Sequence, residues 1–240
     1  EAGKMDSNDP SAADANKGLI KRSSFTTGGR EVDLVGRLHT DIFFQSRYML
    51  NEVTTRIKLA RCKDSFCLMT SEAEQYKVKI VSAIMRIRKV KINPSVYMAH
   101  TKALEDGTAK YPIKRVICKT FTVPAGYLDF IQEKLFSGQL PTRLIIGCVD
   151  NKAFNGDYKL NPFNFQHFST TELTVYLDGH QHSIKPLQMD YANNQYVNAG
   201  TRKENQDEGN DIDRSEFAEG FSLYVFDLTP DLSENGSFMV

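Results

Sequence analysis

The sequence lacks the motifs by which many enzyme families are identified. Its 240 residues contain no GxSxG, no Walker A, no HExxH and no GxGxxG placed after a predicted strand. Asp150 and Asp157 could be a pair of catalytic acids, but each lies beside an Asn-rich turn, where Asp usually bonds to the backbone. We therefore predict no catalytic activity and no cofactor.

An excess of positive charge is also missing. The chain has 30 Lys and Arg against 30 Asp and Glu, so its formal net charge is zero. Proteins that coat nucleic acid through its phosphates usually carry a basic excess. The balance disfavours direct wrapping of a genome.

Cysteine is sparse and its spacing does not form a metal-binding pattern. The four cysteines, at positions 62, 67, 118 and 148, include no CxxC pair. Cys118 and Cys148 fall in predicted strands, where a thiol behaves as a small hydrophobic group. We expect reduced cysteines in the core of an intracellular protein.

Long hydrophobic runs are absent as well. No apolar stretch approaches the ~20 residues that a membrane-spanning helix needs. The sequence as given, which starts at Glu1, shows no signal peptide. We expect no membrane-spanning segment.

The most informative stretch that is present runs from Leu140 to Phe168. Its apolar run 144–149 has the length of a strand buried on both faces. The following residues combine the turn signals Asn155-Gly156 and Asn161-Pro162 with several phenylalanines. This pattern predicts an ordered loop whose aromatic side chains are buried against something.

The rest of the chain favours β-structure. Alternation or apolar runs predict strands over 53–60, 76–92, 113–123, 143–149, 172–177 and 221–228, with a hairpin at Asp178-Gly179. The phase of the alternation changes within 76–92, which requires bulges. The single helix we predict is 94–105, which Asn93 would cap and Pro94 would begin. This pattern predicts an all-β sandwich of the jelly-roll kind.

The predicted strand 76–92 is strongly basic. One interpretation is an inward surface that meets nucleic acid; the alternative is a solvated strand face whose charges discourage edge pairing. The residues concerned are Lys77, Lys79, Arg86, Arg88, Lys89 and Lys91.

Two metal-site hypotheses are weak. His180 and His182 could be two ligands of a cupin-like site, but no motif supplies a third, and exposed residues at a hairpin tip are the better interpretation. The acidic cluster within 204–213 lacks the order of an EF-hand loop. We predict no metal site.

Six segments resemble the major capsid proteins of Polinton (Maverick) elements and adintovirus-like viruses. They occur in order and cover about residues 30 to 240. The segments are GRLHTDIFFQSRYMLNEV (36–53), KDSFCLM (63–69), VKINPSVYMAHTKAL (90–104), AKYPIKRVICKTFTVPAG (109–126), GQLPTRLIIGCVDNKAFNGDYKLNPFNFQHF (138–168) and FAEGFSLYVFDLTPDLS (217–233).

The resemblance implies a double jelly roll, that is, two eight-stranded sandwiches standing side by side. It assigns residues 30–92 to the later strands of the first sandwich, 93–110 to a helical connector and 111–240 to most of the second, without its last strands. Residues 1–29 would be a flexible segment or loop. The family pattern has further strands before residue 25 and after residue 238.

The same resemblance implies a structural protein of the virion. Three copies would form a pseudo-hexagonal capsomer of an icosahedral shell around double-stranded DNA. The implied partners are further copies, penton and minor capsid proteins, and at most weak non-specific contacts with packaged DNA.

Permanent subunit contacts are rich in apolar side chains. The loop 154–168 is therefore our candidate subunit interface, with the alternative that its aromatic side chains cap the subunit's own core. The residues are Phe154, Tyr158, Phe163, Phe165 and Phe168.

Two other functions remain open. A jelly-roll binding module for sugars or a receptor would need exposed aromatic side chains at loop tips. A domesticated host copy with a non-capsid role would keep the fold and change its use.

Overall fold

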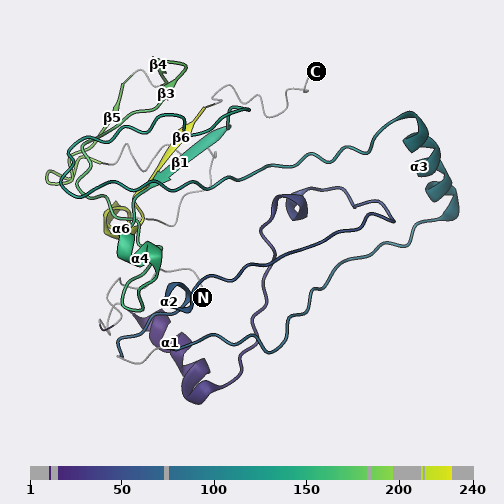
Figure 1. Cartoon of the computed structure of the whole chain (residues 1–240), viewed down its shortest axis with the longest axis horizontal. Helices are drawn as coiled ribbons and strands as arrows, with labels where there is room; N and C mark the ends of the chain where they lie inside the picture. The colour runs from purple at the N-terminus through teal and green to yellow at the C-terminus, as the bar shows by residue number, and fades with distance from the viewer. Residues whose placement is uncertain are drawn as a thin grey trace. The chain divides into compact units, whose positions relative to one another are not determined.

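The computed structural model describes residues 11, 16–72, 76–182, 185–196, 212 and 214–228, and these form two compact units. Unit 1 comprises residues 1–30, 62–77 and 122–240, and unit 2 comprises 31–61 and 78–121. Figure 1 shows the elements of both units. The acidic cluster within 204–213 lies outside the described residues, apart from Ile212.

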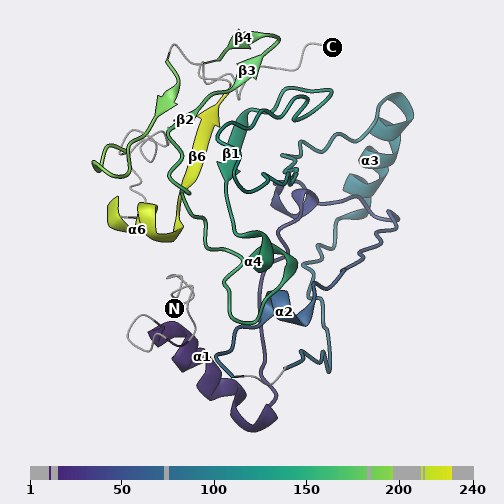
Figure 2. The same cartoon turned by 60° about the vertical axis from the view of Figure 1, so that its left-hand side comes forward.

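Unit 1 contains short antiparallel strand pairs. Strands β1 (Arg143–Gly147) and β6 (Leu223–Asp227) pair in the register Leu144 to Phe226, and they lie side by side in both ribbon views (Figure 2). The remaining pairs are β2 (Glu172–Leu173) with β5 (Leu187–Gln188), and β3 (Tyr176–Leu177) with β4 (His180–Gln181). The strands predicted over 143–149, 172–177 and 221–228 thus correspond to β1, β2 with β3, and β6.

The predicted hairpin is confirmed. Asp178 and Gly179 join β3 to β4 and both have positive φ, 50° and 82°. Two successive residues with positive φ are what a two-residue hairpin turn requires. The local sequence alone therefore determines this turn.

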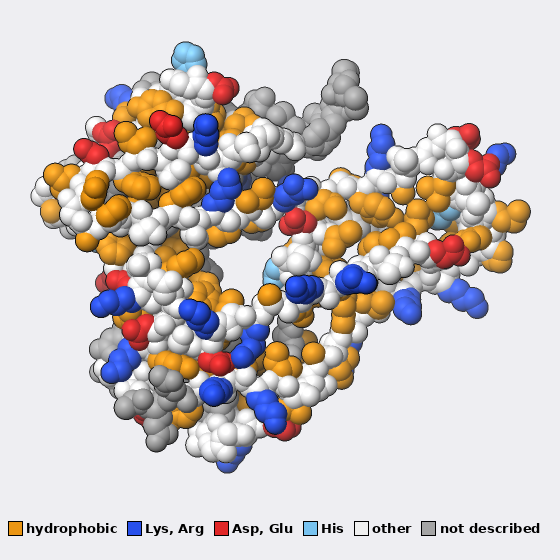
Figure 3. Space-filling model, viewed as in Figure 1, with side chains coloured by type: hydrophobic (Ala, Val, Ile, Leu, Met, Phe, Trp, Pro, Cys, Tyr) orange, Lys and Arg blue, Asp and Glu red, His pale blue; other side chains and the backbone are white. Residues whose placement is uncertain are grey.

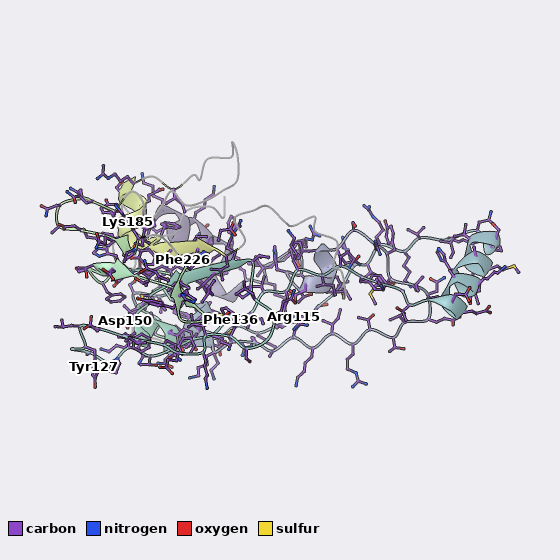
Figure 4. The ribbon with its side chains drawn as sticks, turned by 90° about the horizontal axis from the view of Figure 1, so that it is seen from above. Arg115, Tyr127, Phe136, Asp150, Lys185 and Phe226 are labelled. Atoms are coloured by element: carbon purple, nitrogen blue, oxygen red, sulfur yellow. The ribbon has the colours of Figure 1, made fainter. Side chains whose placement is uncertain are left out.

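The core of unit 1 lies beside β6. Burial alternates along β6 because successive side chains point to opposite faces, so that Tyr224 and Phe226 are buried. Phe136 packs against this cluster, and Figure 4 labels it together with Phe226. The buried cluster consists of Val175, Leu187, Met189, Tyr196, Phe217, Tyr224, Phe226 and Leu228.

Unit 1 also contains helices that the sequence analysis did not predict. A flexible segment or loop was predicted over residues 1–29. The structure has helix α1 (Lys17–Thr26) and the 3₁₀ turn η1 (Thr27–Gly29) in the last part of this range. Residues 1–10 and 12–15 lie outside the described residues. No residue of α1 is buried. A helix that buries no face needs no regular spacing of apolar residues, so the sequence pattern that predicts helices is weak there. The other helices are α2 (Asp64–Cys67), α4 (Asn151–Asn155) and α6 (Arg214–Gly220).

Unit 2 contains the predicted helix. Helix α3 (Pro94–Asp106) begins after Asn93, whose side-chain oxygen accepts a hydrogen bond from the Ser95 amide at 3.2 Å, and ends at Gly107. Two extended segments lead to and from it (Figure 1). The capping signal was therefore sufficient to place this helix.

The strands predicted over 53–60, 76–92 and 113–123 are not formed. The structure assigns neither strand nor helix to these residues where it describes them. A strand needs a hydrogen-bonded neighbour, whereas contacts in unit 2 run through side chains: Arg47 donates to the Lys110 carbonyl at 2.6 Å, and the Leu50 amide donates to the Tyr111 hydroxyl at 3.0 Å. The described residues therefore contain short antiparallel strand pairs in unit 1 together with helices, and the predicted all-β fold is not confirmed.

The prediction of core cysteines was wrong for Cys62, Cys67 and Cys118. All four cysteines are free, and Cys62, Cys67 and Cys118 are exposed. Cys118 lies in one of the extended segments that lack a paired neighbour, so no strand face covers it. Cys148, which follows β1, is partly buried, and this burial raises the pKa of its thiol.

Candidate interface around the phenylalanine loop

The phenylalanine loop, residues 154–168, begins in a short capped helix of unit 1. The Asp150 carboxylate accepts hydrogen bonds from the amides of Lys152 at 2.7 Å and Ala153 at 3.4 Å, which caps α4. Asp157 likewise accepts from the Lys159 amide at 2.9 Å. Both carboxylates therefore bond to the backbone, as the turn-rich sequence predicted, and Figure 4 labels Asp150.

Close packing then fixes the loop against residues 62–77. Gly156 has φ +96°, and a Cβ placed on it would lie 2.6 Å from the Ser65 hydroxyl oxygen and 3.2 Å from the Phe66 nitrogen. The Thr70 amide donates to the Tyr158 carbonyl at 2.8 Å, and the Tyr158 hydroxyl donates to the Tyr76 carbonyl at 2.9 Å. Tyr158 is thus engaged within unit 1.

Phe165 also belongs to the subunit's own packing. Its amide donates to the Gly220 carbonyl at 2.9 Å, and its carbonyl accepts from the Ser222 amide at 3.0 Å. A Cβ placed on Gly147 would lie 2.9 Å from the Phe165 ring, so the ring covers the backbone of β1. These contacts of Phe165 are of the kind that the core alternative describes.

The three other phenylalanines remain exposed. Phe154, Phe163 and Phe168 have 44%, 53% and 55% of their surface accessible. The ring of Phe163 meets the ring of Phe66 edge-on, at 5.7 Å between centroids. These three side chains, which we call the exposed phenylalanines, are the part of the loop that a partner could cover.

Phe168 lies in a turn closed by the Thr170 amide, which donates to the His167 carbonyl at 2.9 Å. Phe168 and Ser169 have positive φ, 45° and 53°. The Ser169 amide donates to Nδ1 of His167 at 2.9 Å, and the His167 ring stacks on Tyr191 at 3.9 Å between centroids. The neighbouring His167 is thus held in place while the Phe168 side chain stays exposed.

The six basic residues of the predicted strand 76–92 are all exposed. Lys77 falls in unit 1, and the other five fall in unit 2. Apolar side chains among them are exposed too, Ile84 to 79%. Figure 3 shows basic and apolar side chains interleaved along the extended segments next to α3. Basic and apolar side chains are thus both exposed along this segment.

The two histidines of the metal hypothesis lie in different surroundings. His180 is exposed in β4, as predicted, whereas His182 is partly buried and its Nε2 hydrogen-bonds to the Asp227 carbonyl at 2.7 Å. Among the described residues, no three of His, Cys, Asp and Glu lie close enough to hold a metal. The ring of His182 thus bonds to the backbone of β6.

The sequence analysis missed a buried pair of tyrosines. The hydroxyl oxygens of Tyr191 and Tyr224 are 2.9 Å apart, and Tyr224 is almost fully buried. Burial, and then the bond to Tyr191, raise the pKa of Tyr224 above its usual value; burial also raises the pKa of Tyr191. The one sequence signal was the alternation along 221–228, which marks Tyr224 as inward but does not identify its partner.

Within the residues that the structure describes, no helix has both the length and the apolar character to cross a membrane.

Comparison with known proteins gives one informative relative. The "Uncharacterized protein F54H12.2" of Caenorhabditis elegans is 24% identical over 234 residues. The alignment covers 93% of this chain and 55% of that protein, so the chain spans about half the length of the curated relative it matches. No protein-family model matches the sequence, and no solved structure matches it.

Proposed function

We propose that this protein is a structural subunit of an icosahedral capsid around double-stranded DNA, without catalytic activity. Three copies form a pseudo-hexagonal capsomer, and its place in the infected cell is the virion shell. The six segments that resemble Polinton-type major capsid proteins support this proposal. So does the observation that carries it: the apolar side chains of unit 2 are extensively exposed.

That exposure calls for a covering partner. Val35, Ile84 and Val116 have 99%, 79% and 85% of their surface accessible. Soluble monomers rarely expose large contiguous apolar patches, and permanent subunit interfaces are both large and apolar. A protein that functions only in an assembly can carry such residues, because further copies bury them.

The double jelly roll is part of the same proposal. The antiparallel pairs β1–β6 and β2–β5 supply strands of the second sandwich, and α3 is the connector between the sandwiches. The alternating residues 53–60 and 78–92 become strands of the first sandwich when neighbouring strands pair with them. Penton and minor capsid proteins are the further partners, and DNA contacts are weak.

The mass and the outline of the purified full chain test the proposal. We expect size-exclusion chromatography with light scattering to give three times the monomer mass, and negative-stain images to show hexagonal outlines or closed shells. A folded protein that stays monomeric at micromolar concentration would contradict the proposal.

Variants of the exposed phenylalanines test the interface. We expect Phe154→Ser with Phe168→Ser to lower the trimer content at least about tenfold, since apolar anchors contribute about 1–2 kcal/mol each. Circular dichroism should show an unchanged fold. Tyr176→Ser is the matched control, because Tyr176 is exposed in unit 1 outside the loop. A trimer that resists the double substitution would remove these residues from the interface.

Phe165→Ala separates the interface from the core. Because the Phe165 ring covers β1, we expect this substitution to lower the free energy of unfolding by about 3 kcal/mol. The expected result is unfolding of the subunit rather than release of folded monomers.

A jelly-roll binding module for sugars or a receptor is the second candidate. The observation in its favour is Phe168, an exposed aromatic side chain at the tip of a supported turn. Glycan binding by a monomer that Phe168→Ser abolishes would favour this function over the capsid.

A further inference from the structure

Ser24 lies in an exposed, basic stretch near the end of α1. Lys21 and Arg22 stand three and two positions before it, and Phe25 follows it. No other Ser or Thr in the sequence has basic residues at both of these positions. Residues 20–30 are all exposed, and Phe25 has 56% of its surface accessible. The Ser24 hydroxyl and the charges beside it are therefore accessible to a second protein.

Helix α1, the purple helix in Figure 2, is held weakly. It has 10 residues, none of them buried, and the Asn16 side chain does not cap its first turn. Isolated helices of this length are marginal in water. The end of α1 can therefore open without separating packed side chains.

The Ser24 hydroxyl is occupied while the helix is closed. It donates a hydrogen bond to the Lys21 carbonyl at 2.7 Å. Hydroxyls that bond back to the preceding turn support a helix little and often bend it. The hydroxyl becomes available for reaction when the last turn of α1 opens.

We propose that Ser24 is a phosphorylation site for a serine kinase that selects basic residues ahead of its target. The Ser24 oxygen attacks the γ-phosphorus of ATP, the bond from this phosphorus to the bridging oxygen breaks, and ADP leaves. The hydroxyl proton passes to the catalytic carboxylate of the kinase. Lys21 and Arg22 bind acidic side chains of the kinase, because complementary charges select the partner. The site does not depend on how copies of the chain associate.

The phosphate then keeps the end of α1 open. A phosphoserine carries a charge of about −1.5 to −2 and has no hydroxyl proton to donate to the Lys21 carbonyl. Ser24 also lies in the last turn of α1, which ends at Thr26. Negative charge is unfavourable there, because the carbonyl end of a helix is itself negative. Phosphorylation thus shifts α1 toward its open state.

Phosphate incorporation into the full chain tests the site. We expect a purified kinase of this specificity, supplied with ATP and Mg²⁺, to modify Ser24, which tandem mass spectrometry locates. Ser24→Ala should abolish this incorporation, and Arg22→Ala should lower kcat/KM at least about tenfold through the lost charge contact. Ser23→Ala is the matched control, because it keeps both basic residues and should react as the unmodified chain does.

Two results would overturn the site. One is phosphate on Ser23 in place of Ser24. The other is a folded chain that takes up no phosphate on Ser24. A peptide of residues 17–29, treated in parallel, then shows whether recognition fails, when it also stays unmodified, or access fails, when it reacts.

Hydrogen exchange tests the effect on α1. We expect the amides of residues 20–26 to exchange about threefold faster in the phosphorylated chain, as the charge at the helix end predicts. Ser24→Ala loses the hydroxyl bond without gaining charge and should change the rates less. The amides of α3 serve as an internal reference. Equal exchange in α1 before and after phosphorylation would overturn the opening of the helix and leave the site itself.

Discussion

Gly156 lets the phenylalanine loop approach residues 62–77. Its φ of +96° is accessible to glycine at little cost, and its missing side chain leaves room for Ser65 and the Phe66 nitrogen. A methyl group at this position would meet the Ser65 hydroxyl oxygen first and then the backbone of α2 at Ser65 and Phe66. The close approach of the loop at this position thus depends on the absence of a Cβ at Gly156.

We expect Gly156→Ala to lower the free energy of unfolding by about 2 kcal/mol or more, from backbone strain and the contact together. Urea denaturation measures the change. Gly179→Ala is the control, because Gly179 has φ +82° but nothing within 4 Å of its Cβ position, so that strain alone remains, about 1 kcal/mol. Equal losses in the two variants would contradict the close contact.

The buried pair of tyrosines makes the stability of the folded protein depend on pH in the alkaline range. The folded-state pKa of Tyr224 lies above the value of about 10 in unfolded chains, because burial disfavours the phenolate. Its contribution to stability is complete below that pH and is lost as the pH rises further, since the unfolded state then releases the proton first.

We therefore expect the free energy of unfolding to fall more steeply above about pH 10 in the unmodified protein than in Tyr224→Phe. At neutral pH the variant should be less stable by about 1 kcal/mol, because it loses the hydroxyl contact with Tyr191. Denaturation series at several pH values measure both effects, and Tyr176→Phe controls for the loss of one tyrosine. Parallel pH profiles for the protein and Tyr224→Phe would contradict the buried phenol.

At the scale of the element, α3 shows what a cap contributes when packing contributes little. None of its residues is buried, so its stability in a single subunit comes from local interactions and from hydrogen bonds such as the long one that the Tyr97 hydroxyl donates to Glu52 at 3.4 Å. The Asn93 side chain, which accepts from the Ser95 amide, is the best defined of these.

We expect Asn93→Ala to destabilise α3 by about 1 kcal/mol and to speed hydrogen exchange of the amides in 95–106 about fivefold. Asn93→Asp keeps a side-chain acceptor and should exchange as the unmodified protein does. Mass spectrometry of peptides from this helix measures the rates. Unchanged exchange in Asn93→Ala would mean that contacts other than the cap hold the helix.

The elements that the sequence predicted correctly are those specified by adjacent residues. Asn93-Pro94 begins a helix and Asp178-Gly179 forms a hairpin turn, because caps and turns depend on a few neighbouring backbone angles. The strand predicted over 53–60 depends instead on a distant neighbour that donates and accepts hydrogen bonds. Alternation predicts which side chains would share a face, but it cannot supply the partner.

The candidate site was predictable to a similar extent. Its aromatic composition identified the phenylalanine loop as the place to look, and three of its five aromatic residues are exposed phenylalanines. The engagement of Tyr158 by Tyr76 joins residues 82 positions apart, and no local pattern encodes it. Which side chains face outward is therefore a result of tertiary packing.

At the scale of the whole molecule, the exposed apolar surface of unit 2 predicts a difference between free and assembled subunits. Half of the chain's 30 Lys and Arg lie in unit 2, so trypsin has many cleavage sites there. We expect the first cuts in dilute protein to fall within 78–93 and 107–121, and assembly to slow them at least about tenfold through burial. Cleavage at Lys17 serves as an internal reference, and equal rates in both states would contradict burial of unit 2.

Unit 1 is assembled from three separate stretches of chain, with both stretches of unit 2 inserted between them. During synthesis, residues 62–77 leave the ribosome long before Tyr158, their later neighbour, has been made. The early stretches must therefore wait, with apolar side chains uncovered, until residues 122–240, about the last half of the polypeptide, emerge. Folding that waits for such long-range contacts is slow and prone to aggregation. Newly made chains should therefore depend on chaperones or on further copies of the protein to complete folding.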